Sequence, residues 1–241
     1  MKNVRALSPL VVLCGVMLSG YSQAQDTSTT LYIAHGAPGR NFGSTNGASS
    51  TNNPSLPIDI SVNGNCIVKG LTYGEIGGPY VSPGGSYDFQ VSMANTVSPC
   101  SGSVVYTAPA VAINGGTTNL GVITLDASNN LVGQIYPIDL MSVPNNQARV
   151  VVVNSTQGPV TASVSTSAGT GTLSIQPSSM QEGTVIEGIY TASVNNGAGT
   201  QVAGPLQVNF ENRDLYIFVI AGSDANQSVQ LIGPKIIYGV F

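Results

Sequence analysis

The chain has 241 residues, of which 42% are hydrophobic and only 7% are charged, and its formal net charge is −4. This mildly acidic balance argues against a surface that follows nucleic-acid phosphates, and the many aliphatic and β-branched residues argue against disorder. The length is sufficient for two modest domains.

The N-terminus, Met1 to Ala24, has the three parts of a secretory signal peptide. Lys2 and Arg5 make its start basic, Leu10 to Leu18 is an apolar run, and Ser22-Gln23-Ala24 offers small residues for cleavage. The apolar run is too short for a permanent membrane-spanning helix. We therefore expect cleavage and export to the periplasm, the cell surface or the extracellular space, with no transmembrane segment in the mature chain.

The next predicted element is a strand over Thr30 to His35, followed by a loop over Gly36 to Leu56 that is rich in Gly, Ser, Asn and Thr. A loop of this length inside a compact domain is either functional or merely tolerated, and its composition favours the second interpretation. Its distinctive side chains, Arg40 and Phe42, are candidate surface or ligand-binding residues.

A hairpin and a third strand are predicted between Ile58 and Met93. Ile58 to Val62 alternates apolar and polar residues, as a half-buried strand does, and Asn63-Gly64 suits a type I′ turn. Gly77-Gly78-Pro79 interrupts the pattern and predicts a glycine-rich crossing, because proline cannot donate to a strand ladder. The third strand is expected to include Tyr87.

Further short strands are expected up to the C-terminus, separated by Gly, Asn, Ser and Pro. They are Ser103–Thr107, Asn119–Leu125, Leu131–Ile138, Ala148–Asn154, Val160–Val164, Thr172–Ile175, Thr184–Ile186, Ile189–Val194, Leu206–Phe210, Asp214–Ala221, Ser228–Ile232 and Ile236–Phe241. This pattern predicts an all-β chain with two tandem immunoglobulin-like β-sandwich domains of Greek-key type. We expect the first domain at 28–142, a linker at 143–146 and a divergent second domain at 147–241.

Three segments of the first domain carry a resemblance to a known family: LYIAHGAP at Leu31 to Pro38, PIDISVNG at Pro57 to Gly64, and LTYGEIGGPYVSPGGSYDFQV at Leu71 to Val91. They resemble the bacterial family of domains of unknown function called DUF4397, which has a strand ending in His-Ala-Ser-Pro and a Val-Asp-x-Val-Asn-Gly hairpin. This chain departs from the family in having Gly36-Ala37-Pro38 where the family usually has Ala-Ser-Pro, and in a long insertion after Pro38. The resemblance implies secreted or cell-surface β-sandwich modules, often in tandem, with no established catalytic residues.

Two cysteines, Cys66 and Cys100, follow the predicted signal peptide. An exported chain with an even pair usually bridges them, so we predict a disulfide, with two free buried thiols as the alternative. Two cysteines and one distant histidine are too few for a closed zinc site. No cofactor motif occurs, so we predict neither a metal nor a cofactor.

His35 is the single histidine, so any Ser–His or Cys–His nucleophilic site would have to use it. Its place at a strand end favours a structural role in binding a turn. Glu75, Glu182, Glu187 and Glu211 are candidates for paired acid–base catalysis, but solvated carboxylates of this kind occur in most β-proteins. We predict no catalytic residue.

Tyr73 and Tyr80 are candidate ligand-binding residues, since sugars often stack on exposed aromatic rings, although packing in a core is the favoured interpretation. The chain has no tryptophan. The sequence thus predicts a non-enzymatic protein of the cell envelope or extracellular space with a structural, adhesive or binding role. Its expected partners are a cell-surface protein or a glycan, not a nucleic acid. The alternatives are a glycan-binding module and, less favoured, a hydrolase.

Overall fold

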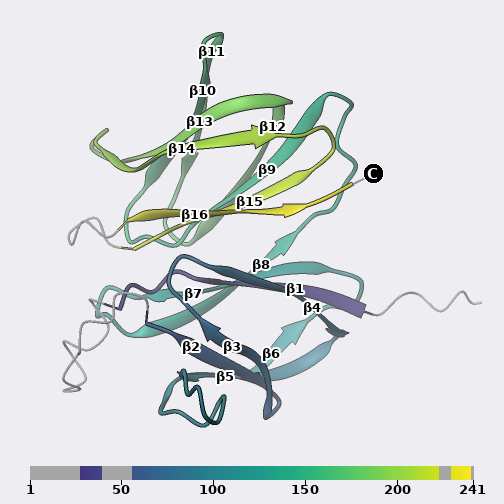
Figure 1. Cartoon of the computed structure of the whole chain (residues 1–241), viewed down its shortest axis with the longest axis vertical. Helices are drawn as coiled ribbons and strands as arrows, with labels where there is room; N and C mark the ends of the chain where they lie inside the picture. Colours follow the sequence, from purple (N-terminus) through teal and green to yellow (C-terminus); the bar gives the residue numbers. More distant parts are fainter. Residues whose placement is uncertain (1–27, 40–55, 223–228, 240–241) are drawn as a thin grey trace, which may run out of the picture.

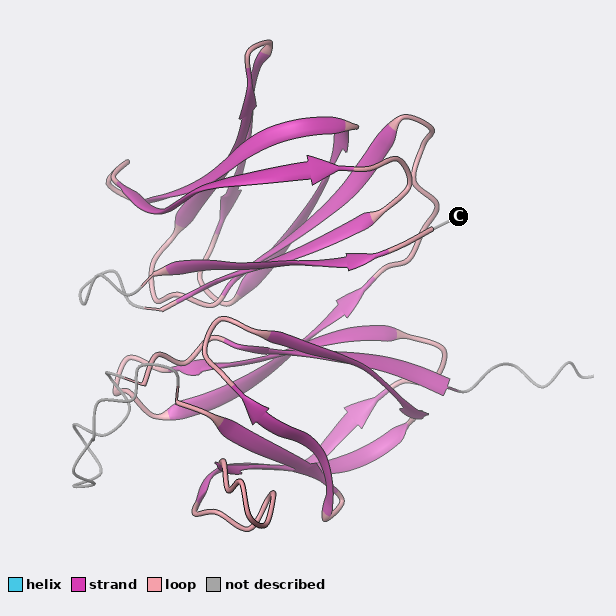
Figure 2. Ribbon diagram, in the orientation of Figure 1, coloured by secondary structure: helices cyan, strands magenta, loops and turns pink. Residues whose placement is uncertain are grey.

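The protein, as a computed structural model, is described over residues 28–39, 56–222 and 229–239. Within these residues it consists of sixteen β-strands in four four-stranded sheets (Figure 1), and no part of them is helical (Figure 2). Accordingly, this part of the chain has no helix that could cross a membrane. The predicted all-β fold is confirmed, while the predicted signal peptide, Arg40 and Phe42 lie outside the described residues.

The first sandwich is formed by strands β1 to β8. These are β1 (Ser28–His35), β2 (Ile58–Val62), β3 (Asn65–Leu71), β4 (Ile76–Pro83), β5 (Gly85–Met93), β6 (Val104–Ile113), β7 (Thr118–Leu125) and β8 (Leu131–Ile138). One sheet has the order β4-β1-β7-β8 and the other the order β3-β2-β5-β6. We call the first the inner sheet, because it faces the second sandwich, and the other the outer sheet (Figure 1).

The second sandwich repeats this plan with eight further strands. These are β9 (Gln147–Asn154), β10 (Val160–Thr166), β11 (Gly169–Ile175), β12 (Ser179–Ile186), β13 (Gly188–Asn196), β14 (Gln201–Phe210), β15 (Leu215–Ala221) and β16 (Gln230–Ile237). Its inner sheet has the order β12-β9-β15-β16 and its outer sheet β11-β10-β13-β14. β9 pairs antiparallel with β12 and parallel with β15, as β1 does with β4 and β7. Each strand therefore has a counterpart eight strands later, and the prediction of two tandem sandwiches is confirmed.

The two inner sheets pack face to face, so the four sheets form a stack of four layers (Figure 1). Between the two sandwiches lies an apolar cluster that we call the inter-sandwich core. It joins Tyr32, Leu120, Val122 and Tyr136 of the first sandwich to Val151, Val153, Leu215, Ile217 and Val219 of the second. Each sandwich also has its own core between its inner and outer sheets.

Burial on both faces explains the composition of the central strands. In β9, Val150 and Val152 face the core of the second sandwich, whereas Val151 and Val153 face the inter-sandwich core. Every residue of β15 is buried. A strand that is covered on both faces needs an uninterrupted apolar run rather than an alternating one, and such runs are what these two strands provide.

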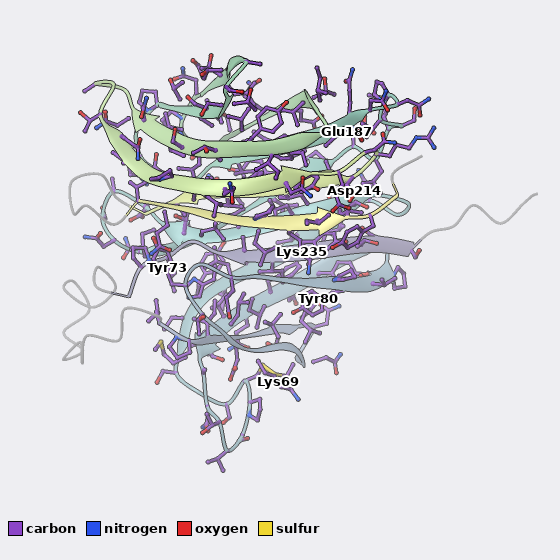
Figure 3. The ribbon with its side chains drawn as sticks, turned by 45° about the horizontal axis from the view of Figure 1, so that its top comes forward. Lys69, Tyr73, Tyr80, Glu187, Asp214 and Lys235 are labelled. Carbon is purple, nitrogen blue, oxygen red and sulfur yellow. A yellow bond between two sulfur atoms is a disulfide. The ribbon has the colours of Figure 1, made fainter. Side chains whose placement is uncertain are left out.

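Edge strands of the two inner sheets meet at the seam between the sandwiches. In β4, Gly78 has a φ of 109° and a Cβ atom there would lie 2.8 Å from the carbonyl oxygen of Leu31, so the backbone requires glycine. In β16, Lys235 donates a hydrogen bond from Nζ to the Gly78 carbonyl at 3.0 Å, and the same nitrogen lies 5.7 Å from the ring centroid of Tyr32. Figure 3 shows Lys235 at this seam. Lys235 therefore links the second sandwich to both an edge and a central strand of the first.

Two predictions about strands were wrong. Residues 77–79 form part of β4 rather than a crossing, because β4 is an edge strand, where a proline need not donate to a neighbour. The separate final strand over Ile236–Phe241 does not occur either: Ile236 and Ile237 continue β16 across an irregularity in its pairing with β15, and residues 240–241 lie outside the described part. Val143, in the predicted linker, is buried in the inter-sandwich core.

Candidate functional site

His35 is fully buried at the end of β1 and both of its ring nitrogens are used in hydrogen bonds. Nε2 lies 2.7 Å from the carbonyl oxygen of Leu56, which can only accept, so Nε2 carries the proton. Nδ1 accepts a hydrogen bond from the backbone N–H of Ala37 at 3.3 Å. Burial lowers the pKa of His35 to about 4, against the opposing effects of the Leu56 carbonyl and the Glu75 charge. The imidazole is therefore neutral at physiological pH and closes a turn.

Asn154 has the same place and the same bonding pattern in the second sandwich. It ends β9, it is fully buried, and its Oδ1 accepts the N–H of Thr156 two residues on, at 2.9 Å. Its Nδ2 donates to the carbonyl oxygens of Gly158 and Ile175 at 2.9 and 3.1 Å. Because an asparagine forms the corresponding bonds in the repeat, closing this turn requires a side chain with one acceptor and one donor.

The predicted disulfide is present: Cys66 of β3 is bonded to Cys100, with 5.8 Å between their Cα atoms. Cys100 lies in the loop between β5 and β6, which we call the cystine loop (residues 94–103). This loop covers Asp59, a buried carboxylate of β2. Oδ2 of Asp59 accepts the backbone N–H groups of Cys100 and Asn95 at 2.8 and 3.1 Å, and Oδ1 accepts that of Gly70 at 2.8 Å.

Asp59 is held in its charged form by these bonds. Its burial alone would raise the pKa of the carboxyl group, but the three N–H donors and the nearby charge of Lys69 outweigh burial, so the pKa lies below its usual value. The cystine loop is thus fixed to the outer sheet by one covalent bond and one carboxylate. A cysteine pair could be found from the sequence, but the partners of Asp59 could not.

Tyr73 and Tyr80 do not share an aromatic surface. Tyr73 packs against the inter-sandwich core, whereas Tyr80 packs against the core of the first sandwich. Both are half-buried, and Figure 3 shows them apart. The arrangement places the two rings against different hydrophobic clusters, as expected of side chains that fill cores.

The four candidate carboxylates have different surroundings. Glu182 of β12 forms an ion pair with the buried Arg149 of β9. Glu75 accepts the backbone N–H of Thr72, while Glu187 and Glu211 are exposed after β12 and β14. Across the described residues, no group of three or more His, Cys, Asp or Glu side chains could hold a metal ion.

An apolar cleft of about 270 Å³ lies between the inner and outer sheets of the first sandwich. We call it the first-sandwich cleft. It lies on the side where the edge strands β6 and β8 face each other, and strands β1, β2, β5 and β7 form its floor. Its lining is Leu31, Ile33, Ile60, Phe89, Val91, Tyr106, Ala108, Val111, Ala112, Gly121, Val122, Ile123, Gly133, Gln134 and Ile135. The sequence analysis did not predict this cleft. Two of its lining residues, Gly121 in β7 and Gly133 in β8, were a signal of it, because glycine within a strand leaves room beside the backbone.

No family model matches the chain, and no curated protein matches it. Among solved structures, the chain is similar to the Bacillus anthracis TIE protein, with a TM-score of 0.27, 10% sequence identity, and coverage of 82% of this chain and 35% of that one. It is also similar to CBMbc (family CBM26) from Eubacterium rectale Amy13K, in complex with maltoheptaose. There the TM-score is 0.23, the identity 11%, and the coverage 88% of this chain and 97% of that one. The chain thus spans about a third of the TIE chain, and likenesses at these scores carry no functional argument.

Proposed function

We propose that the protein is an exported, non-catalytic β-sandwich protein with a structural or adhesive role in the cell envelope or extracellular space. The observation that carries the proposal is the inter-sandwich core, which joins both inner sheets through buried residues such as Leu120, Leu215 and Val219. A large hydrophobic interface between domains opposes relative motion. The two modules then present their outer sheets and loops at a fixed separation, which suits a spacer or an adhesive surface.

Two further observations support a non-catalytic role in an oxidising compartment. The imidazole of His35 is buried and bonded at both nitrogens, and an asparagine fulfils its role in the second sandwich. The bond between Cys66 and Cys100 is of the kind that persists outside the reducing cytosol. Membership of the DUF4397 family stays a prediction that agrees with this role.

The proposal can be tested by expressing the full chain from its own N-terminus in a bacterium and fractionating the cells. We expect a mature protein that begins near Gln25, is found outside the cytoplasm, and shows a Cys66–Cys100 cross-link by mass spectrometry before reduction. Beads coated with it should adhere to cells of the producing strain more than beads coated with heat-unfolded protein. A full-length cytoplasmic chain in which Cys66 and Cys100 are both alkylated without prior reduction would contradict export.

Catalysis is tested separately with the variant His35→Asn, which copies the residue of the second sandwich. We expect no turnover in a broad hydrolase screen for either form of the protein. Turnover by the wild type would overturn the non-catalytic role, and its loss in a folded His35→Asn variant would assign the activity to His35. A glycan-binding role has less support, because Tyr73 and Tyr80 pack against different cores; a glycan array would test it directly.

A further inference from the structure

We propose that the first-sandwich cleft is a binding site for a small, uncharged, apolar molecule carrying an aromatic ring or a short alkyl chain. This inference goes beyond the structural role proposed above. If the binding site is disproved, the proposed structural role still stands. It is based on the repeat within the chain, because the two sandwiches can be compared residue by residue through their matching strand registers.

The first missing side chain is at Gly121 of β7. His35 and Asn154 occupy the same place in the two sandwiches. His35 pairs with Ile123 and Asn154 pairs with Ile220, so these two isoleucines correspond. Gly121 and Phe218 each lie two residues before their isoleucine and therefore correspond as well. Phe218 is 3% exposed and packs in the core of the second sandwich. Gly121 instead lines the cleft, so the first sandwich lacks a benzyl group at a place where its repeat has one.

The second missing side chain is at Gly133 of β8. Gly133 pairs with Ile123, and Leu231 of β16 pairs with Ile220, so these two positions correspond as well. Leu231 packs against the core of the second sandwich, whereas Gly133 lines the cleft and the Tyr106 ring packs over it, 3.1 Å from where a Cβ atom would lie. Both glycines therefore stand where the repeat places large apolar side chains.

The surrounding residues compensate only in part for these losses. When the first residues of β2 and β10, Ile58 and Val160, are matched, Val62 corresponds to Val164. Their partners Phe89 and Ala192 then correspond, and Phe89 also lines the cleft. A volume of about 270 Å³ nevertheless stays open. A site lined by apolar groups and of this size takes apolar ligands, since even smaller dry cavities in protein cores bind single aromatic rings.

The lining also defines the chemical class of the ligand. No charged side chain lines the cleft, and Gln134 is the one amide among its lining residues, with its Oε1 accepting the hydroxyl of Tyr136. A charged ligand would lose its hydration there without gaining a partner. The cleft is reached from solvent between two edge strands, where Ile135 is 36% exposed and Ala112 is exposed. An uncharged apolar molecule can therefore enter without the sheets separating.

The substitution Gly121→Phe copies the second sandwich and tests the site. A Cβ atom at Gly121 would have no neighbour nearer than 3.7 Å and the backbone there is not left-handed, so the change is sterically allowed. The matched control is Gly171→Phe in β11 of the second sandwich, an exposed glycine whose Cβ would likewise meet nothing nearer than 3.6 Å. The two variants add the same side chain, one inside the cleft and one outside it.

The first experiment titrates the full chain and both variants with N-phenyl-1-naphthylamine, an uncharged probe whose fluorescence rises in apolar surroundings. We expect saturable one-to-one binding to the wild type and to Gly171→Phe, and an affinity at least about tenfold weaker for Gly121→Phe. The inference is overturned if the wild type does not bind saturably, or if folded Gly121→Phe binds as the wild type does.

The second experiment does not depend on a variant. Benzene is added to wild-type protein with labelled methyl groups, and NMR chemical shifts are followed. We expect the largest changes at Leu31, Ile33 and Ile60, which line the cleft. Changes confined to methyl groups of the inter-sandwich core or the second sandwich, or no changes at all, would contradict the site.

Discussion

The two sandwiches have the same strand order, the same pairing and the same closed turn after their first strand, yet different side chains stabilise them. In the second, Phe210 packs edge to face against Tyr216 and Phe218, with ring centroids 4.8 and 6.4 Å apart. In the first, a disulfide and the buried Asp59 hold the outer sheet, and a cleft stays open between the sheets. The comparison teaches that strand pattern and turn chemistry suffice for this fold, whereas the filling of each core is free to vary.

The largest expected effect is that of Phe218→Gly, which gives the second sandwich the glycine of the first. Phe218 is 3% exposed within an aromatic cluster, so we expect a loss of about 5 kcal/mol in the free energy of unfolding. Most of it comes from the cavity and the rest from glycine in a strand. Urea unfolding measures it, with Gly171→Phe as a control that should change stability little. A loss below about 1 kcal/mol would show that the second core does not depend on this ring.

The next effect is that of removing the disulfide with the double variant Cys66→Ala and Cys100→Ala. The bond closes a loop between residues 34 apart in sequence, so the expected loss of stability is about 3–4 kcal/mol. The loss should lower the unfolding free energy of the whole chain, because the inter-sandwich core makes the two sandwiches unfold together. Hydrogen exchange of amides that open only on global unfolding should therefore speed up in β9 and β15 as well as in β2, β3 and β5. Acceleration confined to the first sandwich would contradict joint unfolding.

His35 predicts a loss of stability in mild acid. Its pKa of about 4 lies below the ordinary value of 6.5, so the unfolded chain takes up a proton first as the pH falls. The folded protein should lose about 3 kcal/mol between about pH 6.5 and pH 4 relative to a protein without this group. His35→Asn should fold and lack that part of the pH dependence, as measured by urea unfolding at several pH values. The same pH dependence in both proteins would show that His35 is not its source.

The smallest expected effect is that of Asp59→Asn, which removes a charge from the cystine loop. The amide loses the charge-assisted bonds to the N–H groups of Cys100 and Gly70, so we expect a loss of about 2 kcal/mol at pH 7. Because the pKa of Asp59 is lowered in the folded protein, its contribution is present at neutral pH and disappears as acid protonates it. The control is Thr161→Asn, at the corresponding position of β10. If both variants lower the free energy of unfolding by the same amount, the charge of Asp59 does not stabilise the cystine loop.

Much of the fold could be predicted from local sequence. The hairpin turn at Asn63-Gly64 has positive φ at both residues, of 49° and 77°, as its composition requires. The disulfide followed from the compartment and the cysteine count. The strand at 76–83 was missed because Gly78 and Pro79 are unusual in strands. An edge strand tolerates them, but whether a strand lies at the edge depends on the whole sheet and not on the segment.

The inter-sandwich core and the first-sandwich cleft could not be predicted from single segments. The unbroken apolar run of β15 indicates a central strand, but the cover of its second face comes from β1 and β7, which are far away in sequence. The correspondence of Gly121 and Gly133 with Phe218 and Leu231, which contrasts the cleft with the second core, needs the strand registers. Features that depend on how two copies differ require the structure of both.

The central claim is that the two sandwiches are joined by a buried apolar core, and calorimetry of the intact mature chain tests it most directly. A shared core makes the two sandwiches unfold together, so the account predicts one transition in which the calorimetric enthalpy equals the van 't Hoff enthalpy. Two separate transitions, one for each sandwich, would contradict it.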